Sequence, residues 1–570
     1  MITSRSTEIK ARVQGRKSAL PSTFSGHEFL IFKKLHGCVL MLVALMACVA
    51  FGETLSVKML DGECWWGVAN YFGSKMPFTE KSTLNVDLRR NGFSNQFASM
   101  LVSDKGRVVW CDDQTSVIIT NGTIKMVCET AAPVLLERGG GNLRSAFLHA
   151  ANKWFPPSGK TPDLLFFSAP QYNTWIELTY NQNEKDILAY AQSMLDNGLP
   201  PGVLMIDDTW QAGYGDWRFE PTRFKDPKGM VDKLHAQGFK VILWMCPWVS
   251  MDIPAFRRIA WGMNPNDVNG YPTKGGFLMD GGKPAATSWW NGYSALLDLT
   301  HPNAQAWFKE ELDGLVRDFG VDGFKFDGGS VDNYAHGYGV YDKKSSSGDQ
   351  VLAYARFCLD YPACEYRNAW RFQGKPVVER LHDKKHKWSE LQNLVPDMIV
   401  GGLLGHPFMC PDMIGGGSWK AFLPGAPFDA ELFIRSAQVH ALCPMMQFSA
   451  SPWRVLNKEH QQIIRDAVAI RQKFAARFVE LAKASGCTGE PMLRNLEYNY
   501  PGMGYAGVRD QFMMGTDLLV APVMEKGQTE RQVVIPPGTW VADDGETIIG
   551  PKTVSVKAPL SRLPYFTLVK

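Results

Sequence analysis

The run Gly323-Phe-Lys-Phe-Asp-Gly-Gly-Ser330 constrains the fold of the chain more than any other stretch. Side chains alternate between the two faces of a strand, so the two phenylalanines face one side while Lys325 and Asp327 face the other. The two glycines that follow end the strand and leave open space beside the carboxylate. Such a strand suits a barrel active site in which the lysine keeps the carboxylate ionised. It also suits a salt bridge inside a barrel, and the run alone leaves both interpretations open.

Helices and buried strands alternate on both sides of this run. Strand-like segments are found at 164–167, 203–210, 240–248, 377–383, 403–412 and 441–448, and helical patterns at 184–197, 228–237 and 303–319. Several of the strands end in polar side chains, as in barrels that carry their site on the loops after the strands. The alternation therefore predicts an α/β fold built on a (β/α)8 TIM barrel.

The barrel does not account for the whole chain, because 570 residues are too many for one hydrophobic core. Residues 53–163 alternate short apolar runs with turn residues and contain a hairpin signal, Asn121-Gly122, so we expect an N-terminal β-sandwich there. We expect the catalytic barrel over 164–485, ending in a long helix. A smaller C-terminal β domain is expected over 486–570.

Residues 1–52 form a leader in which 31–52 have the pattern of a secretory signal. Basic residues precede an apolar core at Val39–Ala47, and small residues follow it. Cys48 lies in a loose lipoprotein box, which offers lipidation as an alternative outcome. We therefore expect a secreted or periplasmic protein, with a lipoprotein as the variant. No later segment is long and apolar enough to span a membrane.

The composition narrows the class of partner. Aromatic residues make up 12% of the chain and include 18 tryptophans, which favours stacking on sugar rings. The net charge of +3 gives no argument for a nucleic-acid partner. The 11 cysteines show neither a disulfide framework nor a metal-binding spacing, so neither metal nor cofactor is expected.

Acidic side chains follow the predicted strands, and a barrel brings such strand ends together. These side chains are Asp207, Asp208, Asp327, Asp383 and Asp412. Tryptophans near the same strands are Trp210, Trp248, Trp289 and Trp290, of which we expect Trp210 and Trp248 to contact the substrate.

No Ser-His-Asp order, P-loop or HExxH motif is visible. Carboxylates with aromatic neighbours suit glycoside hydrolysis, in which an ionised and a protonated carboxyl flank the sugar carbon. Asp327, beside Lys325, is the natural ionised member, and Asp383 is a candidate proton donor.

From about Pro170 onward the chain resembles the retaining α-glycosidases of glycoside hydrolase family 31. The resemblance is carried by the order of the parts and by four segments, which are Phe219–Phe224, Leu297–Asn303, Asp510–Val523 and Val534–Trp540. It implies a barrel enzyme that needs no cofactor and acts on an oligosaccharide or glycoconjugate.

The resemblance also implies residue roles. Asp327 occupies the position of the family's nucleophile, and Asp383 that of its acid/base. Arg367 and Asp412 correspond to substrate-binding residues. Two departures stand beside the acid/base position: a lysine follows Asp383 where the family has Asn, and Arg380 stands where an aromatic residue is expected.

Two further departures resemble the α-galactosidases of a related clan. Lys325 stands where glucose-specific members have Trp, and Ile206-Asp-Asp-Thr-Trp210 replaces their Asp-Tyr-Met-Asp. Galactose differs from glucose by an axial 4-hydroxyl. The carboxylates of Asp207 and Asp208 can accept hydrogen bonds from O4 and O6, and Lys325 can donate to O3 or O4. Trp210 is expected to close over the sugar.

The sequence therefore predicts an exo-α-galactosidase that releases terminal α-linked galactose by double displacement through a covalent glycosyl-aspartate. Within the family the alternatives are an α-glucosidase and an α-N-acetylgalactosaminidase. Other classes are a lyase that uses Lys325 as a Schiff base and a non-catalytic carbohydrate-binding barrel. The linkage, the leaving group and the oligomeric state stay open.

Overall fold

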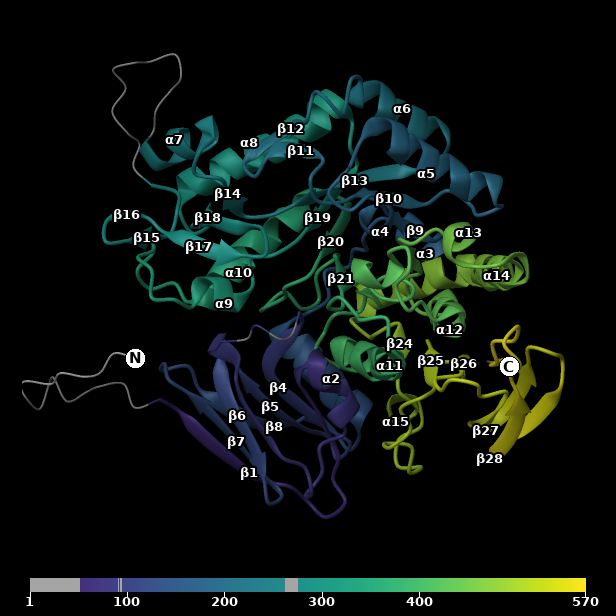
Figure 1. Ribbon diagram of the computed structural model, residues 1–570. Coiled ribbons are helices and arrows are strands. Elements are labelled where there is room, and N and C mark those ends of the chain that lie inside the picture. The colour runs from purple at the N-terminus through teal and green to yellow at the C-terminus, as the bar shows by residue number, and fades with distance from the viewer. Residues whose placement is uncertain (1–51, 91, 93–94, 262–274, 570) are drawn as a thin grey trace, which may run out of the picture. The chain divides into compact units, whose positions relative to one another are not determined.

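The computed structural model describes residues 52–90, 92, 95–261 and 275–569 (Figure 1). The predicted secretory signal and the lipoprotein cysteine, Cys48, lie almost entirely before this part of the chain. Among the helices in these ranges, none combines the length and the apolar character that crossing a bilayer requires.

The N-terminal part of the described chain is built from two antiparallel sheets. One has the strand order β1-β7-β6-β3 and the other β2-β4-β5-β8. Their bounds are β1 Thr54–Lys58, β2 Trp65–Ala69, β3 Leu84–Asp87, β4 Phe97–Ser103, β5 Arg107–Cys111, β6 Thr115–Thr120, β7 Thr123–Cys128 and β8 Val134–Arg138. The expected hairpin is present between β6 and β7. Asn121 and Gly122 form its turn with φ values of 48° and 63°, the conformation that a tight hairpin requires.

One helix in this region was not expected from the sequence. Helix α2, Leu143–Trp154, follows β8 and begins at Asn142, whose side chain accepts a hydrogen bond from the Ser145 backbone N–H. The Ser145 hydroxyl returns to the backbone of Asn142, which completes a capping box. The helix was missed because turn residues recur throughout this region, so Asn142 was interpreted as one more turn between strands.

The predicted barrel is present and nearly closed. In the described chain its sheet has eight strands in the order β22-β21-β20-β19-β13-β10-β9-β23, and every neighbouring pair is parallel. The bounds are β9 Gln171–Asn173, β10 Val203–Ile206, β13 Lys240–Met245, β19 Gly323–Phe326, β20 Ala363–Tyr366, β21 Val378–Arg380, β22 Met409–Cys410 and β23 Gln447–Phe448. A parallel bridge between Met413 and Gln447 joins the two edges. The α/β fold class predicted from the sequence is therefore confirmed.

Two of the eight strands were misplaced or missed. Residues 164–167, predicted as a strand, begin the short helix α3, Leu165–Ser168. A short apolar run does not distinguish the two structures, and Asp163 favours the helix by accepting the Leu165 N–H. Strand β9 has the sequence Gln-Tyr-Asn, and β20 carries a charged residue, Glu365, so neither reads as a buried strand.

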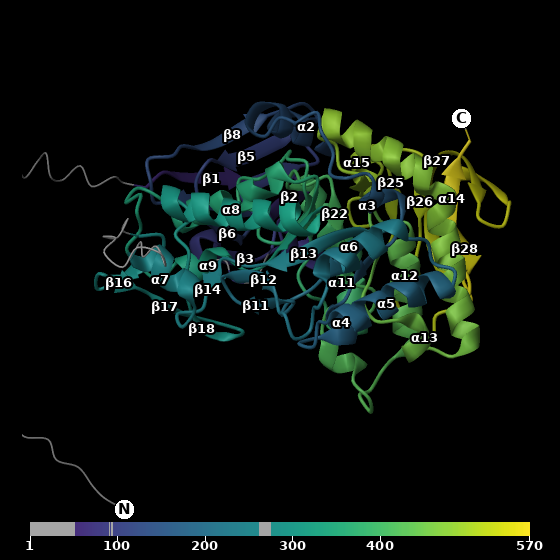
Figure 2. The ribbon, with the colours of Figure 1, turned by 90° about the horizontal axis from the view of Figure 1, so that it is seen from above.

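Helices follow the barrel strands and cover them from outside (Figures 1 and 2). They include α4 Trp175–Leu178, α5 Glu184–Asp196, α6 Pro227–Ala236, α7 Pro254–Trp261, α8 Pro302–Phe319, α9 Val331–Tyr334, α10 Ser347–Ala355, α11 Trp388–Leu403, α12 Ala430–Ala441, α13 Pro452–Val455 and α14 Lys458–Thr488. Phe324 and Phe326 of β19 face this outer layer, where their rings lie 4.8 Å from Tyr361 and 5.5 Å from Tyr354. The outward direction of the two phenylalanines agrees with the alternation in the sequence.

Short elements complete the loops of the barrel. The hairpin strands are β11 Gln211–Gly213 with β12 Asp216–Phe219, β15 Met279–Asp280 with β16 Lys283–Pro284, and β17 Ala286–Trp289 with β18 Gly292–Leu296, which also pairs with β14 Trp248–Val249. In the described residues two 3₁₀ helices lie in the barrel loops, η3 Arg356–Asp360 and η4 Trp419–Phe422, and two lie in the N-terminal region, η1 Asn70–Lys75 and η2 Leu88–Arg90.

The C-terminal part of the chain is an antiparallel sheet with its own hydrophobic core. Within the described residues the strand order is β24-β25-β26-β29-β27-β28. The bounds are β24 Leu493–Arg494, β25 Phe512–Met514, β26 Leu518–Val520, β27 Glu530–Ala542, β28 Thr547–Lys557 and β29 Tyr565–Leu568, and α15 Leu496–Asn499 follows β24. Helix α14 contacts this sheet, because Lys473 donates to the Tyr565 hydroxyl at 3.1 Å and Phe474 packs on the same ring (Figure 2). Trp540 is fully buried in its core.

Candidate active site

A cavity of about 460 Å³ lies beyond the carboxyl ends of the barrel strands. Its wall contains four carboxylates and four cationic side chains, which are Asp207, Asp208, Asp327, Asp383, Lys325, Arg367, Arg380 and Lys385. Charged groups from strands that are remote in sequence therefore meet in one space. Most of the site residues predicted from the sequence lie in this wall.

The Asp327 carboxylate is fixed by three donors. Its Oδ1 accepts from Nη1 of Arg367 at 2.8 Å and from the Gly328 N–H at 2.7 Å, and its Oδ2 accepts from Nε1 of Trp244 at 2.9 Å. Burial alone would raise the pKa of Asp327, but the charges of Arg367 and Lys325 lower it below the ordinary value. The site therefore presents an ionised, oriented carboxylate, which is the state that a nucleophile requires.

Only glycine fits at position 328 without displacing its neighbours. Its φ is 67°, and a Cβ at this position would lie 2.2 Å from Cζ3 of Trp248. A side chain would therefore push the tryptophan and the end of β19 apart. The glycine lets the backbone turn sharply and donate its N–H to the Asp327 carboxylate.

Lys325 and Asp207 form a buried ion pair at the inner end of the cavity. Lys325 Nζ lies 2.6 Å from Oδ2 of Asp207, and both side chains are at most 5% exposed. Burial alone would lower the pKa of Lys325, but Asp207 and Asp327 raise it above the ordinary value. A Schiff-base lysine must lose its proton to react, so this environment argues against the lyase interpretation.

Asp208 lies beside this pair in a network of neutral donors. Its carboxylate accepts from the Tyr214 hydroxyl at 3.2 Å, from Nδ2 of Asn291 at 3.0 Å and from Nε2 of Gln211 at 3.4 Å. Burial and the charge of Asp207 raise the pKa of Asp208 to about 6. Sequence analysis missed Tyr214 and Asn291 because both lie in hairpin turns far from any recognisable motif.

One guanidinium connects the two predicted catalytic carboxylates. Arg367 contacts Asp327 through Nη1, and its Nη2 lies 3.6 Å from Oδ2 of Asp383. Oδ1 of Asp383 accepts from Nη1 of Arg380 at 2.8 Å. Burial alone would raise the pKa of Asp383, but Arg367 and Arg380 lower it well below the ordinary value. Asp383 is therefore an anion in the free protein and must acquire a proton before it can serve as an acid.

Asp412 is not among the side chains that line the cavity. It is fully buried, it contacts Nη1 of Arg380, and it accepts the backbone N–H of Lys384 at 2.7 Å and that of Gly417 at 3.1 Å. The expected contact with substrate stays a prediction. In this structure Asp412 holds the loop that carries Asp383.

Trp210 and Trp248, for which we expect contact with the substrate, are not among the side chains that line the cavity. Both side chains are fully buried. Trp210 donates to the backbone carbonyl of Trp244 at 2.8 Å, and Trp248 donates to Thr287 Oγ1 at 3.0 Å. Their positions next to strand ends suggested exposure, but hairpins that the sequence did not reveal cover them.

Other aromatic side chains line the cavity. They are Trp175, Tyr180, Trp244, Trp290 and Trp419. Trp290 is 53% exposed and packs against the stacked pair of Trp248 and Trp289. Strand alternation was a usable signal for Trp244, because it lies opposite Lys325 in the β13–β19 register and so faces the same side.

The N-terminal sheets contribute to the site through the segment before β4. Asn95 Nδ2 donates to the backbone carbonyl of Arg380 at 3.0 Å, and Gln96 Nε2 donates to those of Arg367 and Arg380 at 3.0 Å each. Gln96 also forms a parallel bridge with Ala369. The two arginines of the cavity are thus held from outside the barrel.

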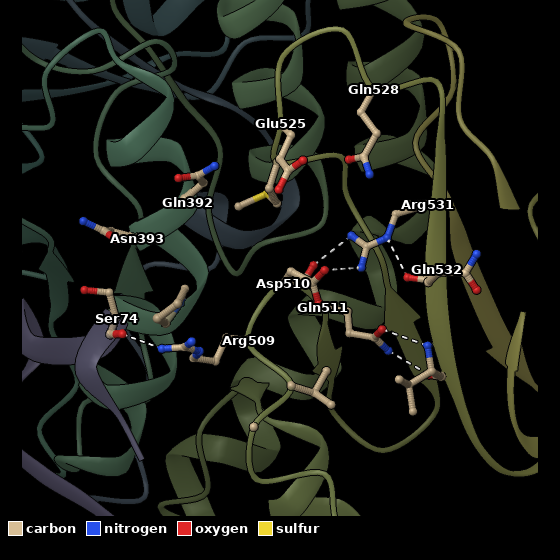
Figure 3. Close-up of a pocket in the computed structure, with 15 residues that line it drawn as sticks. Ser74, Gln392, Asn393, Arg509, Asp510, Gln511, Glu525, Gln528, Arg531 and Gln532 are labelled. Carbon is tan, nitrogen blue, oxygen red and sulfur yellow. Dashed lines mark hydrogen bonds and ion pairs between the residues drawn. The ribbon is translucent and has the colours of Figure 1, made fainter. Parts of the chain in front are cut away.

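A second cavity, of about 630 Å³, lies between η1, α11 and the C-terminal sheet (Figure 3). Several of its polar side chains bind one another or the backbone. Arg531 pairs with Asp510, Arg509 donates to the Ser74 carbonyl, and Gln511 binds the backbone of Val534 at both ends of its amide. In the described ranges no group of three or more His, Cys, Asp or Glu is placed to hold a metal ion. The barrel cavity is therefore the candidate active site.

Comparison with known proteins identifies the family of the chain. The model of the glycosyl hydrolases family 31 TIM-barrel domain matches residues 169–476, and that of the family's C-terminal domain matches residues 489–568. The mouse myogenesis-regulating glycosidase is 31% identical over 459 residues, which are 77% of this chain and 62% of that protein. The isomaltosyltransferase of Sporosarcina globispora is 26% identical over 62% of this chain and 34% of its own length. The chain thus spans less than two thirds of each of these relatives.

Solved structures show the same fold. The family 31 dextranase of Flavobacterium johnsoniae, complexed with glucose, superposes with a TM-score of 0.75 at 19% identity, covering 90% of this chain and 66% of that chain. The α-xylosidase from a soil metagenome, complexed with xylose, gives a TM-score of 0.69 at 19% identity over 90% and 79% of the two chains. With its barrel and C-terminal domains both matched, the chain belongs to glycosyl hydrolase family 31.

Proposed function

We propose that the protein is a retaining exo-α-glycosidase that releases terminal α-linked galactose. The observation that carries the proposal is the buried Lys325–Asp207 ion pair, 2.6 Å long, which lies beside Asp208 in the same cavity as Asp327. A substrate that fills this end must satisfy charged groups that water would otherwise hydrate. A sugar with hydroxyls directed at them meets that requirement.

The reaction proceeds by double displacement. Asp327 attacks C1 of the sugar while Asp383 protonates the leaving oxygen, and a glycosyl-aspartate forms. Water then attacks C1, Asp383 accepts its proton and Asp327 is released. Retaining enzymes hold their two carboxyl groups about 5–5.5 Å apart. The single guanidinium of Arg367, which contacts both Asp327 and Asp383, supports a short separation.

Galactose is the preferred sugar because its 4-hydroxyl is axial. In this proposal Asp207 and Asp208 accept hydrogen bonds from O4 and O6, and Lys325 donates to O3 or O4. A glucoside would leave one of these buried charged groups without a partner, which costs on the order of 1–3 kcal/mol or more. The pKa of about 6 for Asp208 lets this carboxyl accept or donate near neutral pH.

An α-glucosidase is the second candidate. The relatives include a 1,3-α-isomaltosidase from Kribbella flavida and the α-glucosidase 2 of Bacillus thermoamyloliquefaciens. An α-N-acetylgalactosaminidase and a non-catalytic carbohydrate-binding barrel remain alternatives from the sequence. We also propose export from the cytoplasm, on the pattern at 31–52, which cell fractionation tests.

A panel of 4-nitrophenyl α-glycosides tests the function. We expect kcat/KM for the galactoside to exceed that for the glucoside, the xyloside and the N-acetylgalactosaminide by at least about 10²-fold. Asp327→Asn serves as the inactive control. A higher kcat/KM for another member of the panel would reassign the sugar. Binding of galactosides without hydrolysis of any substrate would favour the non-catalytic barrel.

A further inference from the structure

Arg380 occupies a position that the glycosidase reaction described above does not use. It ends strand β21, is 1% exposed, and lies among three carboxylates. Its Nε is 3.1 Å from Oε1 of Glu365, and its Nη1 contacts Oδ1 of Asp383 and Oδ1 of Asp412. The resemblance noted in the sequence places an aromatic residue here, so the guanidinium brings a buried charge that an aromatic ring would not.

The three carboxylates respond differently to this charge. Burial raises the pKa of Glu365 and that of Asp412 above their ordinary values, although Arg380 opposes the rise in both. Asp383 differs, because its pKa is lowered and its side chain is 49% exposed toward the cavity. Arg380 therefore couples most strongly to the carboxylate that can meet a substrate.

The two oxygens of Asp383 have unequal contacts. Oδ1 lies 2.8 Å from Nη1 of Arg380. The Arg380 guanidinium also contacts Asp412 through Nη1 and Glu365 through Nε, and the N-terminal segment binds the Arg380 backbone carbonyl. Oδ2 faces Arg367 at 3.6 Å, beyond hydrogen-bonding distance. Arg380 cannot follow Asp383 if that side chain moves, whereas the contact with Arg367 is already long. Oδ2 is thus the oxygen that is free to exchange a proton.

We propose that Arg380 is a positioning residue for the proposed glycosidase: it holds Oδ1 of Asp383 and presents Oδ2 to the leaving oxygen. In the first half-reaction the C1–O bond to the leaving group breaks, the Asp327–C1 bond forms, and the proton on Oδ2 moves to the leaving oxygen. In the second, water forms a bond to C1, the Asp327–C1 bond breaks, and the proton of the water returns to Oδ2. The inference rests on the proposed function.

The charge of Arg380 also limits the pH range of the first half-reaction. The charged and titratable groups around Asp383 are Lys325 and Asp327 of β19 and its turn, Arg367 after β20, Arg380 of β21, Asp412 after β22, and the neighbours His382 and Lys384. The neighbouring cations lower the pKa of Asp383 more than burial and the neighbouring carboxylates raise it. The protonated form of Asp383 is therefore present only in acidic solution. The kcat/KM for a substrate that needs protonation should therefore fall as the pH rises.

Substrates with different leaving groups isolate this step. An α-galactosyl fluoride needs little or no proton donation, whereas an α-galactosyl disaccharide needs a full proton on its leaving oxygen. In Arg380→Gln we expect kcat/KM for the disaccharide at the wild-type optimum to fall at least about 10-fold, with the fluoride changed by less than about 3-fold. We expect the alkaline limb of the disaccharide profile to move up by about one pH unit or more.

A second variant and a control keep the test decisive if Arg380→Gln does not fold. Arg380→Lys retains the charge but loses the planar guanidinium group. The ratio of kcat/KM for the disaccharide to kcat/KM for the fluoride should therefore still fall. The alkaline limb of the disaccharide pH profile should move less than in Arg380→Gln. Arg435→Lys is the matched control. Arg435 is 1% exposed and donates to backbone carbonyls such as that of Ala558, so this variant should lower the melting temperature and leave the ratio unchanged.

The outcomes separate the two ideas. If the folded Arg380 variants keep the wild-type ratio of disaccharide to fluoride kcat/KM and the wild-type alkaline limb, the proposed role of Arg380 is wrong. The proposed glycosidase function is unaffected by that result. If the wild-type protein hydrolyses neither the fluoride nor any glycoside, the proposed function fails, and the role of Arg380 falls with it.

Discussion

Two cavities in the described part of the chain, the barrel cavity and the one beside the C-terminal sheet, differ in what their polar groups do. In the larger one, at about 630 Å³, Arg509 and Gln511 bind backbone groups, and Arg531 pairs with Asp510 (Figure 3). In the barrel cavity, at about 460 Å³, charged side chains from several strand ends face one another across the space. The smaller cavity has the perturbed and convergent charges that catalysis requires. Volume is therefore a poorer guide to an active site than the convergence of charged side chains.

Removal of the proposed nucleophile should have the largest effect of any change in the barrel cavity. Asp327→Asn keeps the shape of the side chain but not its charge, so we expect kcat/KM for an aryl α-galactoside to fall by at least about 10³-fold. The melting temperature should change little, because the contacts to Trp244 and Gly328 can persist in part. Activity within about 10-fold of wild type would remove Asp327 from the mechanism.

The ion pair at the inner end of the cavity should have the next largest effect. Lys325→Met leaves Asp207 buried without its partner, so we expect the free energy of unfolding to fall by about 3–5 kcal/mol in urea titrations. The matched control is Lys309→Met, which removes the partly exposed Lys309–Asp313 pair and should cost less than about 1 kcal/mol. Equal losses in the two variants would show that the buried pair is not special.

Asp208 should give the stability of the fold a dependence on pH. Its pKa is about 6 in the folded protein, against an ordinary value of 3.8, so the folded state binds the proton more tightly. The contribution is fully present below pH 3.8 and is lost as the pH rises to about 6. The difference corresponds to about 3 kcal/mol.

Comparing wild type with Asp208→Asn isolates this contribution. The variant should gain stability relative to wild type between pH 4 and pH 8, as measured by urea unfolding at each pH. A constant difference between the two proteins over this range would contradict the assignment.

The smallest effect is expected in the larger cavity. Gln392→Ala and Gln532→Ala remove exposed amides that line it, and we expect kcat/KM to change by less than about 2-fold. A loss of 10-fold or more, with the melting temperature unchanged, would mean that this cavity takes part in the reaction and would reverse the comparison drawn above.

The sequence predicts the architecture better than it predicts the wall of the cavity. The barrel strands with regular apolar patterns, such as β10, β13 and β19, were located within a few residues. Strands β9 and β20 were not predicted from the sequence. Polar side chains that point into the barrel interrupt the run of apolar residues by which a buried strand is recognised.

The burial of Trp210 and Trp248 could not be predicted for a different physical reason. Whether a tryptophan after a strand is covered depends on hairpins that close over it, as β17–β18 does over Trp248 through Thr287. Contacts of that kind are set by tertiary packing, which single-sequence patterns do not encode. Asp412 likewise follows a strand as predicted, yet it is fully buried and pairs with Arg380.

The amides of Asn95 and Gln96 make the two N-terminal sheets inseparable from the chemistry of the barrel. These amides fix the backbone at Arg367 and Arg380, so an excised barrel would lose the alignment of both guanidiniums even if it folded. Recombination that exchanges this module for another would therefore alter catalysis rather than only solubility. For engineering, the smallest transferable unit of this protein is the sandwich together with the barrel.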